Sequence, residues 1–248
     1  MKCAIVTPTY NEAGNLEDFV ARILKLNLND VHILVVDDNS PDGTGQLADR
    51  LATQHPGTII VVHRQKKSGL GLAYIAGFKR ALALDADAII QMDTDLSHEP
   101  ETIPAMLELL SNNDVVVGSR YVNKQSDVFK WSFLRKTLSG MGNVYARAVT
   151  GLKVKDVTSG FKCFSRKALA GLPLDSIRCS GFAFQIEVAS LCQARGYSVV
   201  EVPINFKPRA AGRSKMSLGI PMEALWRVWQ IRLTTRGKAS TYPNVTKV

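Results

Sequence analysis

Residues 88–95 have the sequence Ala-Ile-Ile-Gln-Met-Asp-Thr-Asp. The short apolar run contains β-branched residues and predicts a buried strand over residues 88–92. It ends at Asp93 and Asp95, two carboxylates one residue apart. Most isolated Asp-x-Asp pairs are solvated turn residues or helix caps, but ligands of open α/β sheets bind beyond the carboxyl ends of strands. The position therefore favours a divalent cation, Mg²⁺ or Mn²⁺, that carries substrate phosphates.

The chain before this strand repeats the same arrangement. Apolar strands, separated by amphipathic helices, are predicted over residues 3–6, 31–36 and 58–62. The first leads to Pro8, Tyr10 and Glu12, and the second leads to Asp37 and Asp38. Four alternations of strand and helix favour a parallel, doubly wound sheet. Side chains from three strand ends then meet at one edge, which predicts a nucleotide-and-metal site.

Two of the predicted helices begin with recognisable signals. The turn Pro-Asp-Gly at residues 41–43 precedes one of them, and Thr44 is expected to cap it. Gly69 and Gly71 open the other, in a pattern that begins like a dinucleotide-binding fingerprint. The third glycine is absent because position 74 is Tyr, and the motif follows a basic loop. A Rossmann dehydrogenase is therefore disfavoured.

The second half of the chain is less regular. Two further strands are predicted over residues 114–118 and 197–202, and two helices around residues 134–145 and over 182–195. Arg135 and Ser139 are four residues apart and share one helix face, which can hold an anion, although a solvated surface arginine is the alternative. Residues 206–215 carry four cations, which is typical of a mobile clamp over phosphates or of a solvated basic turn.

The chain ends in a basic amphipathic segment. Its apolar stripe consists of Met222, Leu225, Trp226, Trp229 and Leu233. Such a helix can lie in a membrane interface or pack onto the domain, and the sequence leaves both open. The expected organisation is a catalytic domain over residues 1–216, an amphipathic helix over 217–236 and a flexible tail over 237–248.

Composition limits the class of partner and compartment. The 31 Lys+Arg residues against 22 Asp+Glu give a net charge of +9, which favours anionic partners: nucleic acid, nucleotide phosphates or an acidic membrane surface. No apolar run approaches 18 residues and no secretory signal is evident, so neither a spanning helix nor export is expected. Four cysteines without Cys-x-x-Cys spacing indicate reduced thiols in a cytosolic protein rather than a zinc site.

Taken in order, these motifs resemble those of family-2 glycosyltransferases of the GT-A type, and among them the dolichol-phosphate (polyprenol-phosphate) mannosyltransferases. The similar segments are residues 8–12, 37–44, 67–73, 92–98, 118–121, 135–139, 156–161, 181–187 and 209–215. They extend over roughly residues 3–216, and their combination is far more specific than any single one.

The resemblance implies a GT-A-type, Rossmann-like, mostly parallel sheet flanked by helices, in a single domain with a C-terminal amphipathic helix. It implies that Asp93 and Asp95 hold Mg²⁺ or Mn²⁺, and that Ser97 replaces a Gln that supplies a further ligand in some relatives. The implied donor-binding residues are Pro8, Tyr10, Glu12, Asp37, Asp38, Lys67, Asp93, Thr94, Asp95, Arg209 and Lys215. The implied acceptor-phosphate ligands are Arg120, Arg135 and Ser139, and the implied catalytic residues are Asp93, Asp95, Arg120 and Arg135.

The implied reaction transfers mannose from GDP-mannose to polyprenyl (dolichyl) phosphate with inversion. No obvious candidate for a dedicated base is present, and none is required, because a phosphate monoester is already anionic at neutral pH. Catalysis then consists of positioning and of neutralising charge on the leaving GDP. The chain resembles the short form of the family, which is peripheral on the cytosolic face of a membrane or recruited by small membrane subunits.

Three other functions remain as alternatives. A sibling enzyme would use UDP-glucose or another nucleotide sugar with the same lipid acceptor. A non-catalytic nucleotide-sugar binder is disfavoured by the intact acid pairs. A nucleic-acid-binding protein would carry a basic stripe interleaved with exposed aromatics, whereas these cations lie in phosphate-like motifs, so no nucleic-acid partner is expected.

Overall fold

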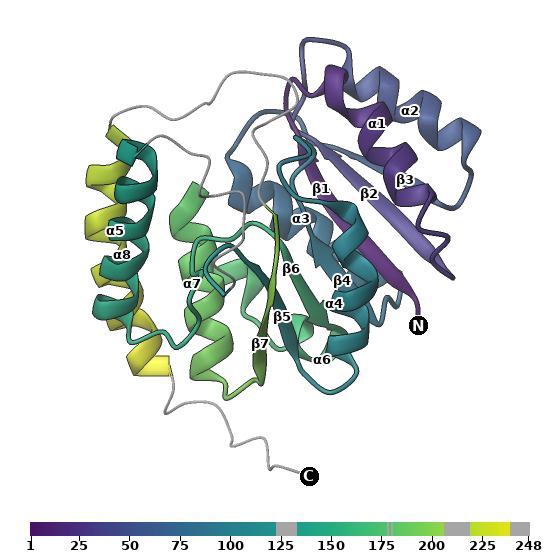
Figure 1. The fold of residues 1–248 in the computed structure, drawn as a ribbon. Helices are drawn as coiled ribbons and strands as arrows, with labels where there is room; N and C mark the ends of the chain where they lie inside the picture. The colour runs from purple at the N-terminus through teal and green to yellow at the C-terminus, as the bar shows by residue number, and fades with distance from the viewer. Residues whose placement is uncertain (123–132, 178, 180, 206–218, 239–248) are drawn as a thin grey trace.

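A computed structural model describes residues 1–122, 133–177, 179, 181–205 and 219–238. Seven strands form one sheet in the order β3-β2-β1-β4-β6-β5-β7 (Figure 1). The strands are β1 (Cys3–Thr9), β2 (Val31–Asp37), β3 (Ile59–His63), β4 (Ala88–Gln91), β5 (Val115–Ser119), β6 (Lys162–Ser165) and β7 (Val199–Pro203). Strands β1 to β4 pair in parallel, as do β5 and β7, whereas β6 is antiparallel to both β4 and β5.

The mostly parallel sheet is confirmed, and one strand was missed. The sequence Lys-Cys-Phe-Ser of β6 is only four residues long and contains a buried lysine, so it gives no apolar run. The strand exists because its backbone pairs with β4 on one side and β5 on the other. That pairing is long-range and leaves no local signal.

Helices cover both faces of the sheet. They are α1 (Ala13–Leu24), α2 (Thr44–Gln54), α3 (Leu70–Ala83), α4 (Ile103–Leu110), α5 (Phe133–Thr150), α6 (Arg166–Ala170), α7 (Gly181–Ala194) and α8 (Gly219–Lys238), with 3-10 turns η1 (Pro100–Thr102) and η3 (Leu174–Ser176). One apolar core lies under α1, α2 and α4, and the other lies under α3, α6 and α7. Alternate residues of β1 supply each core: Ile5 belongs to the first and Val6 to the second.

Helix α3 packs unusually close to the sheet. A Cβ added at Gly77 would lie 2.2 Å from Cγ1 of Val6 and 3.0 Å from Cγ2 of Val36. Only a residue without a side chain fits there. The close approach buries Tyr74 and Phe78 of α3 completely.

The start of α2 corrects one prediction. Thr44 is the first helical residue rather than the cap; Gly43 occupies the cap position with φ = 87° and no side-chain cap bond forms. The Thr44 hydroxyl instead donates to Oδ1 of Asp42 at 2.5 Å and accepts from the backbone N–H of Glu12 at 3.0 Å. Thr44 therefore connects the loop after β2 to the loop after β1.

The C-terminal helix α8 has two different faces. Val228 and Ile231 are buried in the core that includes α7, and Figure 1 shows α5 and α8 side by side. Trp226, Trp229 and Leu233 are 67%, 47% and 70% exposed. The two buried residues lie outside the predicted apolar stripe, so packing onto the domain uses a different face of α8 and leaves Trp226, Trp229 and Leu233 of the stripe uncovered. No helix within the described ranges is long and apolar enough to cross a membrane.

Candidate active site

The carboxyl ends of β2, β1 and β4 lie next to one another in the sheet. The loop after each strand contains one non-glycine residue in the left-handed region: Asn11 at φ = 57°, Asn39 at 59° and Leu96 at 58°. Asparagine tolerates this conformation, whereas for leucine it costs roughly 1–2 kcal/mol. Strain of this kind is concentrated at functional sites, and here it lies between Asp95 and Ser97.

A threonine connects the ends of β4 and β1. The Thr94 hydroxyl lies 2.6 Å from the Thr7 hydroxyl and donates to the backbone oxygen of Pro8 at 3.1 Å. Asp95 accepts the backbone N–H of Ser97 at 3.1 Å and is 6% exposed. The predicted residues Pro8, Thr94 and Asp95 therefore lie together at one edge of the sheet.

The two aspartates after β2 have different surroundings. Asp37 is buried and accepts from the hydroxyl of Thr9 at 3.0 Å and from the backbone N–H of Ser40 at 3.1 Å, so it organises its own loop. Asp38 pairs with Arg64 and accepts the backbone N–H of Ser68 at 3.3 Å. Arg64 was missed, although its position directly after the neighbouring strand β3 was a usable signal.

Two other predicted donor residues are in contact. The Lys67 ammonium lies 4.0 Å from the centroid of the Tyr10 ring, a cation–π arrangement. Glu12 accepts from Nδ2 of Asn15 at 2.8 Å, and its backbone connects to Thr44 as described above. A cation, an aromatic face and carboxylates thus surround the edge where the acid pair lies.

Asp93 is half-buried, with neighbours on both carboxylate oxygens. Oδ1 accepts the hydroxyl of Tyr74. A Cβ added at Gly160 would lie 3.1 Å from Oδ2. The backbone at Gly160 therefore approaches the carboxylate more closely than a side chain would allow.

The acid pair fits a cation that is shared with a diphosphate. The described residues contain no group of three or more His, Cys, Asp or Glu side chains that could hold a metal by themselves. Mg²⁺ typically takes one or two carboxylates, with substrate phosphates and waters completing the shell, which matches Asp93 and Asp95. The Ser97 hydroxyl is buried beside them without a hydrogen-bond partner among the described residues.

Arg120 forms a buried ion pair with Asp156. Its Nε donates to Asp156 at 2.8 Å, and its Nη2 donates to Asp156 at 2.7 Å and to Thr158 at 2.7 Å. Burial alone would raise the pKa of Asp156, but the charge and hydrogen bonds of Arg120 lower it below the ordinary value. Any phosphate contact by Arg120 would therefore be made by a guanidinium that Asp156 already orients.

A buried polar network under the site was not predicted. The Lys162 ammonium donates to the backbone oxygen of Ser159 and to Oε1 of Gln185, the latter at 2.6 Å. Gln91 donates to the same Gln185 oxygen at 2.7 Å and to the backbone oxygen of Gly160 at 3.1 Å. Burial lowers the pKa of Lys162 to about 8. The network holds the 159–160 backbone in place beside Asp93.

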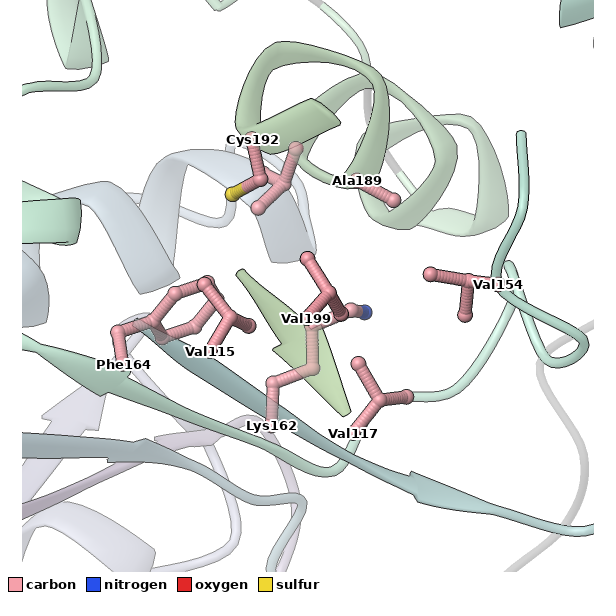
Figure 2. Close-up of a pocket in the computed structure, with 9 residues that line it drawn as sticks. Val115, Val117, Val154, Lys162, Phe164, Ala189, Cys192 and Val199 are labelled. Atoms are coloured by element: carbon pink, nitrogen blue, oxygen red, sulfur yellow. The ribbon is translucent and has the colours of Figure 1, made fainter. Parts of the chain in front are cut away.

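Lys162 also borders an apolar cavity. Figure 2 shows its side chain among Val115, Val117 and Val199, below Cys192 of α7. The cavity volume is about 10 Å³, which is at the lower limit for a single water molecule. It is therefore a packing defect next to a buried cation rather than a substrate pocket.

His98 was also missed. It is 3% exposed and its ring centroid lies 5.3 Å from that of Phe161. Burial lowers the pKa of His98 to about 4 from an ordinary value of 6.5. The imidazole is therefore neutral in the folded protein at physiological pH.

Acid should destabilise the protein through His98. Between pH 6.5 and 4 the unfolded chain binds a proton at this position that the folded chain does not bind. The free energy of unfolding should therefore fall as the pH is lowered through this window, with His98 accounting for about 3 kcal/mol. Chemical denaturation at pH 7, 5.5 and 4.5 measures the decline, and His98→Gln should decline less steeply. Parallel curves for both proteins would show that His98 does not cause it.

Four predicted ligands cannot be placed. Arg135 and Ser139 lie in α5, but their side chains are outside the described part of the structure. Arg209 and Lys215 lie outside the described residues altogether. Their roles remain predictions.

Comparison with known proteins identifies the family. The family model described as "Glycosyl transferase family 2" matches residues 4–172. The chain belongs to glycosyltransferase family 2. The protein is accordingly an enzyme of the glycosyltransferase class, and this disfavours the alternative of a non-catalytic binder.

Three relatives are similar to this glycosyltransferase over most of its length. Polyprenol monophosphomannose synthase of Mycolicibacterium smegmatis is 42% identical over 92% of this chain and 86% of its own length. Undecaprenyl-phosphate mannosyltransferase of Micrococcus luteus is 40% identical over 95% of this chain and 96% of its own length. Dolichol-phosphate mannosyltransferase of Pyrococcus furiosus is 37% identical over 93% of this chain but only 64% of its own.

Solved structures confirm the GT-A-like fold. Glucosyl-3-phosphoglycerate synthase from Mycobacterium tuberculosis, in complex with Mn²⁺, UDP-glucose and phosphoglyceric acid, superposes with a TM-score of 0.65. The match covers 95% of this glycosyltransferase and 80% of the synthase at 19% identity. At this identity the likeness shows the fold alone.

Proposed function

We propose that this glycosyltransferase transfers mannose from GDP-mannose to a polyprenyl phosphate, with inversion at the anomeric carbon. The observation that carries the proposal is that three relatives, 37–42% identical over at least 92% of this chain, are named for mannose transfer to polyprenol, undecaprenol or dolichol phosphates. The acid pair at the end of β4, with the Lys67–Tyr10 contact, supports the proposal because ligands of open α/β sheets bind beyond the carboxyl ends of the strands.

Asp93 and Asp95 are proposed to hold a divalent cation together with the donor diphosphate. When bound, Mg²⁺ or Mn²⁺ would neutralise the charge that develops on the departing GDP. Pro8, Tyr10, Glu12, Asp37, Asp38, Lys67 and Thr94 surround the same edge and are proposed to bind the donor. Arg209 and Lys215 are proposed to close over its phosphates.

The acceptor phosphate is proposed to bind Arg120, Arg135 and Ser139. Asp156 fixes the plane of the Arg120 guanidinium, so that side chain requires little reorganisation when the anion arrives. The phosphate oxygen is itself the nucleophile, and it is ionised at neutral pH. These residues therefore need only hold two anions in line.

The decisive experiment measures transfer of radiolabelled sugar to polyprenyl phosphate. The full chain is incubated in parallel with GDP-mannose and UDP-glucose, each with Mn²⁺, Mg²⁺ or chelator. Metal-dependent product from GDP-mannose alone supports the proposal. Product from UDP-glucose alone would keep the mechanism and replace the donor, and product that survives the chelator would contradict the role of the cation.

A polyprenyl phosphate acceptor resides in a membrane, so the enzyme must reach the membrane surface. The exposed side of α8 is proposed to dock there. Trp226 and Trp229 are exposed on α8, and Met141 and Val144 are exposed on the adjacent α5. Tryptophan is favoured at the level of the lipid head groups. We further propose that the enzyme is peripheral on the cytosolic face, in keeping with four free cysteines, of which three are buried.

Replacing Trp226 and Trp229 with alanine should weaken binding to anionic phospholipid vesicles by about tenfold or more, because apolar surface that would leave water is lost. Cosedimentation with vesicles measures the partition. The matched variant with phenylalanine at both positions keeps an aromatic ring and should retain most of the binding. Equal partition of wild type and the alanine variant would favour recruitment by a small membrane subunit instead.

A further inference from the structure

Position 74 carries the tyrosine that interrupts the glycine pattern after Gly69 and Gly71. In the structure this tyrosine also contacts the acid pair. Its side chain is completely buried in α3, and its hydroxyl donates to Oδ1 of Asp93. The hydroxyl is therefore withdrawn from solvent yet contacts one of the two carboxylates of the acid pair.

The ring of Tyr74 cannot easily move. It stacks on Phe78 at a centroid distance of 5.8 Å and on Phe184 at 5.9 Å, the latter with the ring planes 2° apart. Helix α3 packs closely against its neighbours on both sides of Tyr74, at Gly71 and at Gly77. A Cβ at Gly71 would lie 2.8 Å from the Phe184 ring, and one at Gly77 would lie 2.2 Å from Val6. The phenol oxygen thus occupies a position set by close packing.

The opposite side of the Asp93 carboxylate is bounded as well. The backbone at Gly160 lies so close to Oδ2 that a Cβ there would be 3.1 Å away. The Gly160 backbone oxygen accepts from Gln91 at 3.1 Å, which ties this loop to β4. Asp93 therefore lies between a fixed donor and a fixed backbone wall.

We propose that Tyr74 is a positioning residue: its hydroxyl holds the Asp93 carboxylate in the orientation that binds the divalent cation of the nucleotide-sugar diphosphate. The inference rests on the proposed role of the acid pair. Tyr74 is completely buried, so it acts through Asp93 rather than on the substrate. Hydrogen bonds to metal-binding side chains fix their orientation, and their loss typically weakens metal binding or activity 10–100-fold.

Tyr74→Phe tests this directly, because it keeps the ring and both stacking contacts and removes only the hydroxyl. Binding of Mn²⁺ to the full chain in the presence of GDP is followed by the electron paramagnetic resonance signal of free Mn²⁺. The dissociation constant should rise about 10–100-fold. In transfer assays kcat/KM should fall by a similar factor and recover partly at high Mn²⁺, while the thermal melting curve of the metal-free protein stays close to that of wild type.

Tyr197→Phe is the matched control. Tyr197 is partly buried and precedes β7, at the amino end of that strand and away from the acid pair. Its loss of one hydroxyl should leave Mn²⁺ binding unchanged. A purely structural role of Tyr74 would lower the melting temperature without changing the dissociation constant of the folded protein, and that result would overturn the inference.

Asp95→Ala separates the inference from the function on which it rests. If Asp95→Ala abolishes Mn²⁺ binding and Tyr74→Phe binds like wild type, the acid pair stands and the role of Tyr74 is refuted. If neither variant changes Mn²⁺ binding, the proposed metal site itself is wrong and the role of Tyr74 fails with it. If Asp95→Ala loses Mn²⁺ binding and Tyr74→Phe loses part of it, the result supports both the metal site and the role of Tyr74.

Discussion

Asp95→Ala should lower the rate of sugar transfer by about 10²–10³-fold, the loss typical when one electrostatic stabiliser is removed. Asp95 is 6% exposed and closes its own turn through the backbone N–H of Ser97 at 3.1 Å. Its carboxylate is therefore fixed before substrate arrives. Steady-state transfer of radiolabelled mannose to polyprenyl phosphate measures the effect.

Two comparisons separate charge from structure. Asp95→Asn keeps the shape and the turn but loses the charge, so it should be nearly as slow as the alanine variant. Asp175→Ala removes an exposed carboxylate that pairs with Lys79 on the surface, and should transfer at the wild-type rate. Near-normal turnover of the folded Asp95→Ala enzyme would exclude Asp95 from the cation site.

Asp156→Ala should lower the free energy of unfolding by about 3–5 kcal/mol, the cost of leaving one member of a buried ion pair without its partner. The side chains of Asp156 and Arg120 are 0% and 7% exposed, and two hydrogen bonds of 2.7 and 2.8 Å connect them. Arg120 would retain its charge inside the protein. Equilibrium unfolding in urea measures the loss.

The double variant Arg120→Met/Asp156→Leu tests the origin of this loss. Replacing both members of a buried pair with apolar residues is often nearly neutral, so most of the stability should return. Transfer should not return, because Arg120 is proposed to bind the acceptor phosphate. By contrast, Asp175→Ala breaks an exposed pair and should cost no more than about 1 kcal/mol. A cost for Asp156→Ala as small as that of Asp175→Ala would refute the argument.

Local patterns were sufficient for most of the elements. The apolar run at residues 88–92 became β4 (Ala88–Gln91), and the amphipathic helix predicted between the first two strands became α1 (Ala13–Leu24). Both signals repeat within a few residues, so the sequence displays them directly. The predicted cap at Thr44 was wrong because a residue from another loop, Glu12, competes for its hydroxyl.

The sequence by itself determined most of the strands and helices, with β6 as an exception, together with the strand-end carboxylates and the membership of glycosyltransferase family 2. Hydrophobic periodicity and motif spacing involve residues that are close together along the chain, so these features can be recognised in the sequence without the structure.

Only the tertiary structure decided which partners hold those carboxylates and cations. Tyr74 and Asp93 are 19 residues apart, Arg120 and Asp156 are 36 apart, and Lys162 and Gln185 are 23 apart. Such pairs form because buried polar groups must find partners once the sheet and helices enclose them. The choice of partner depends on the distance between packed segments, which spacing along the chain does not encode.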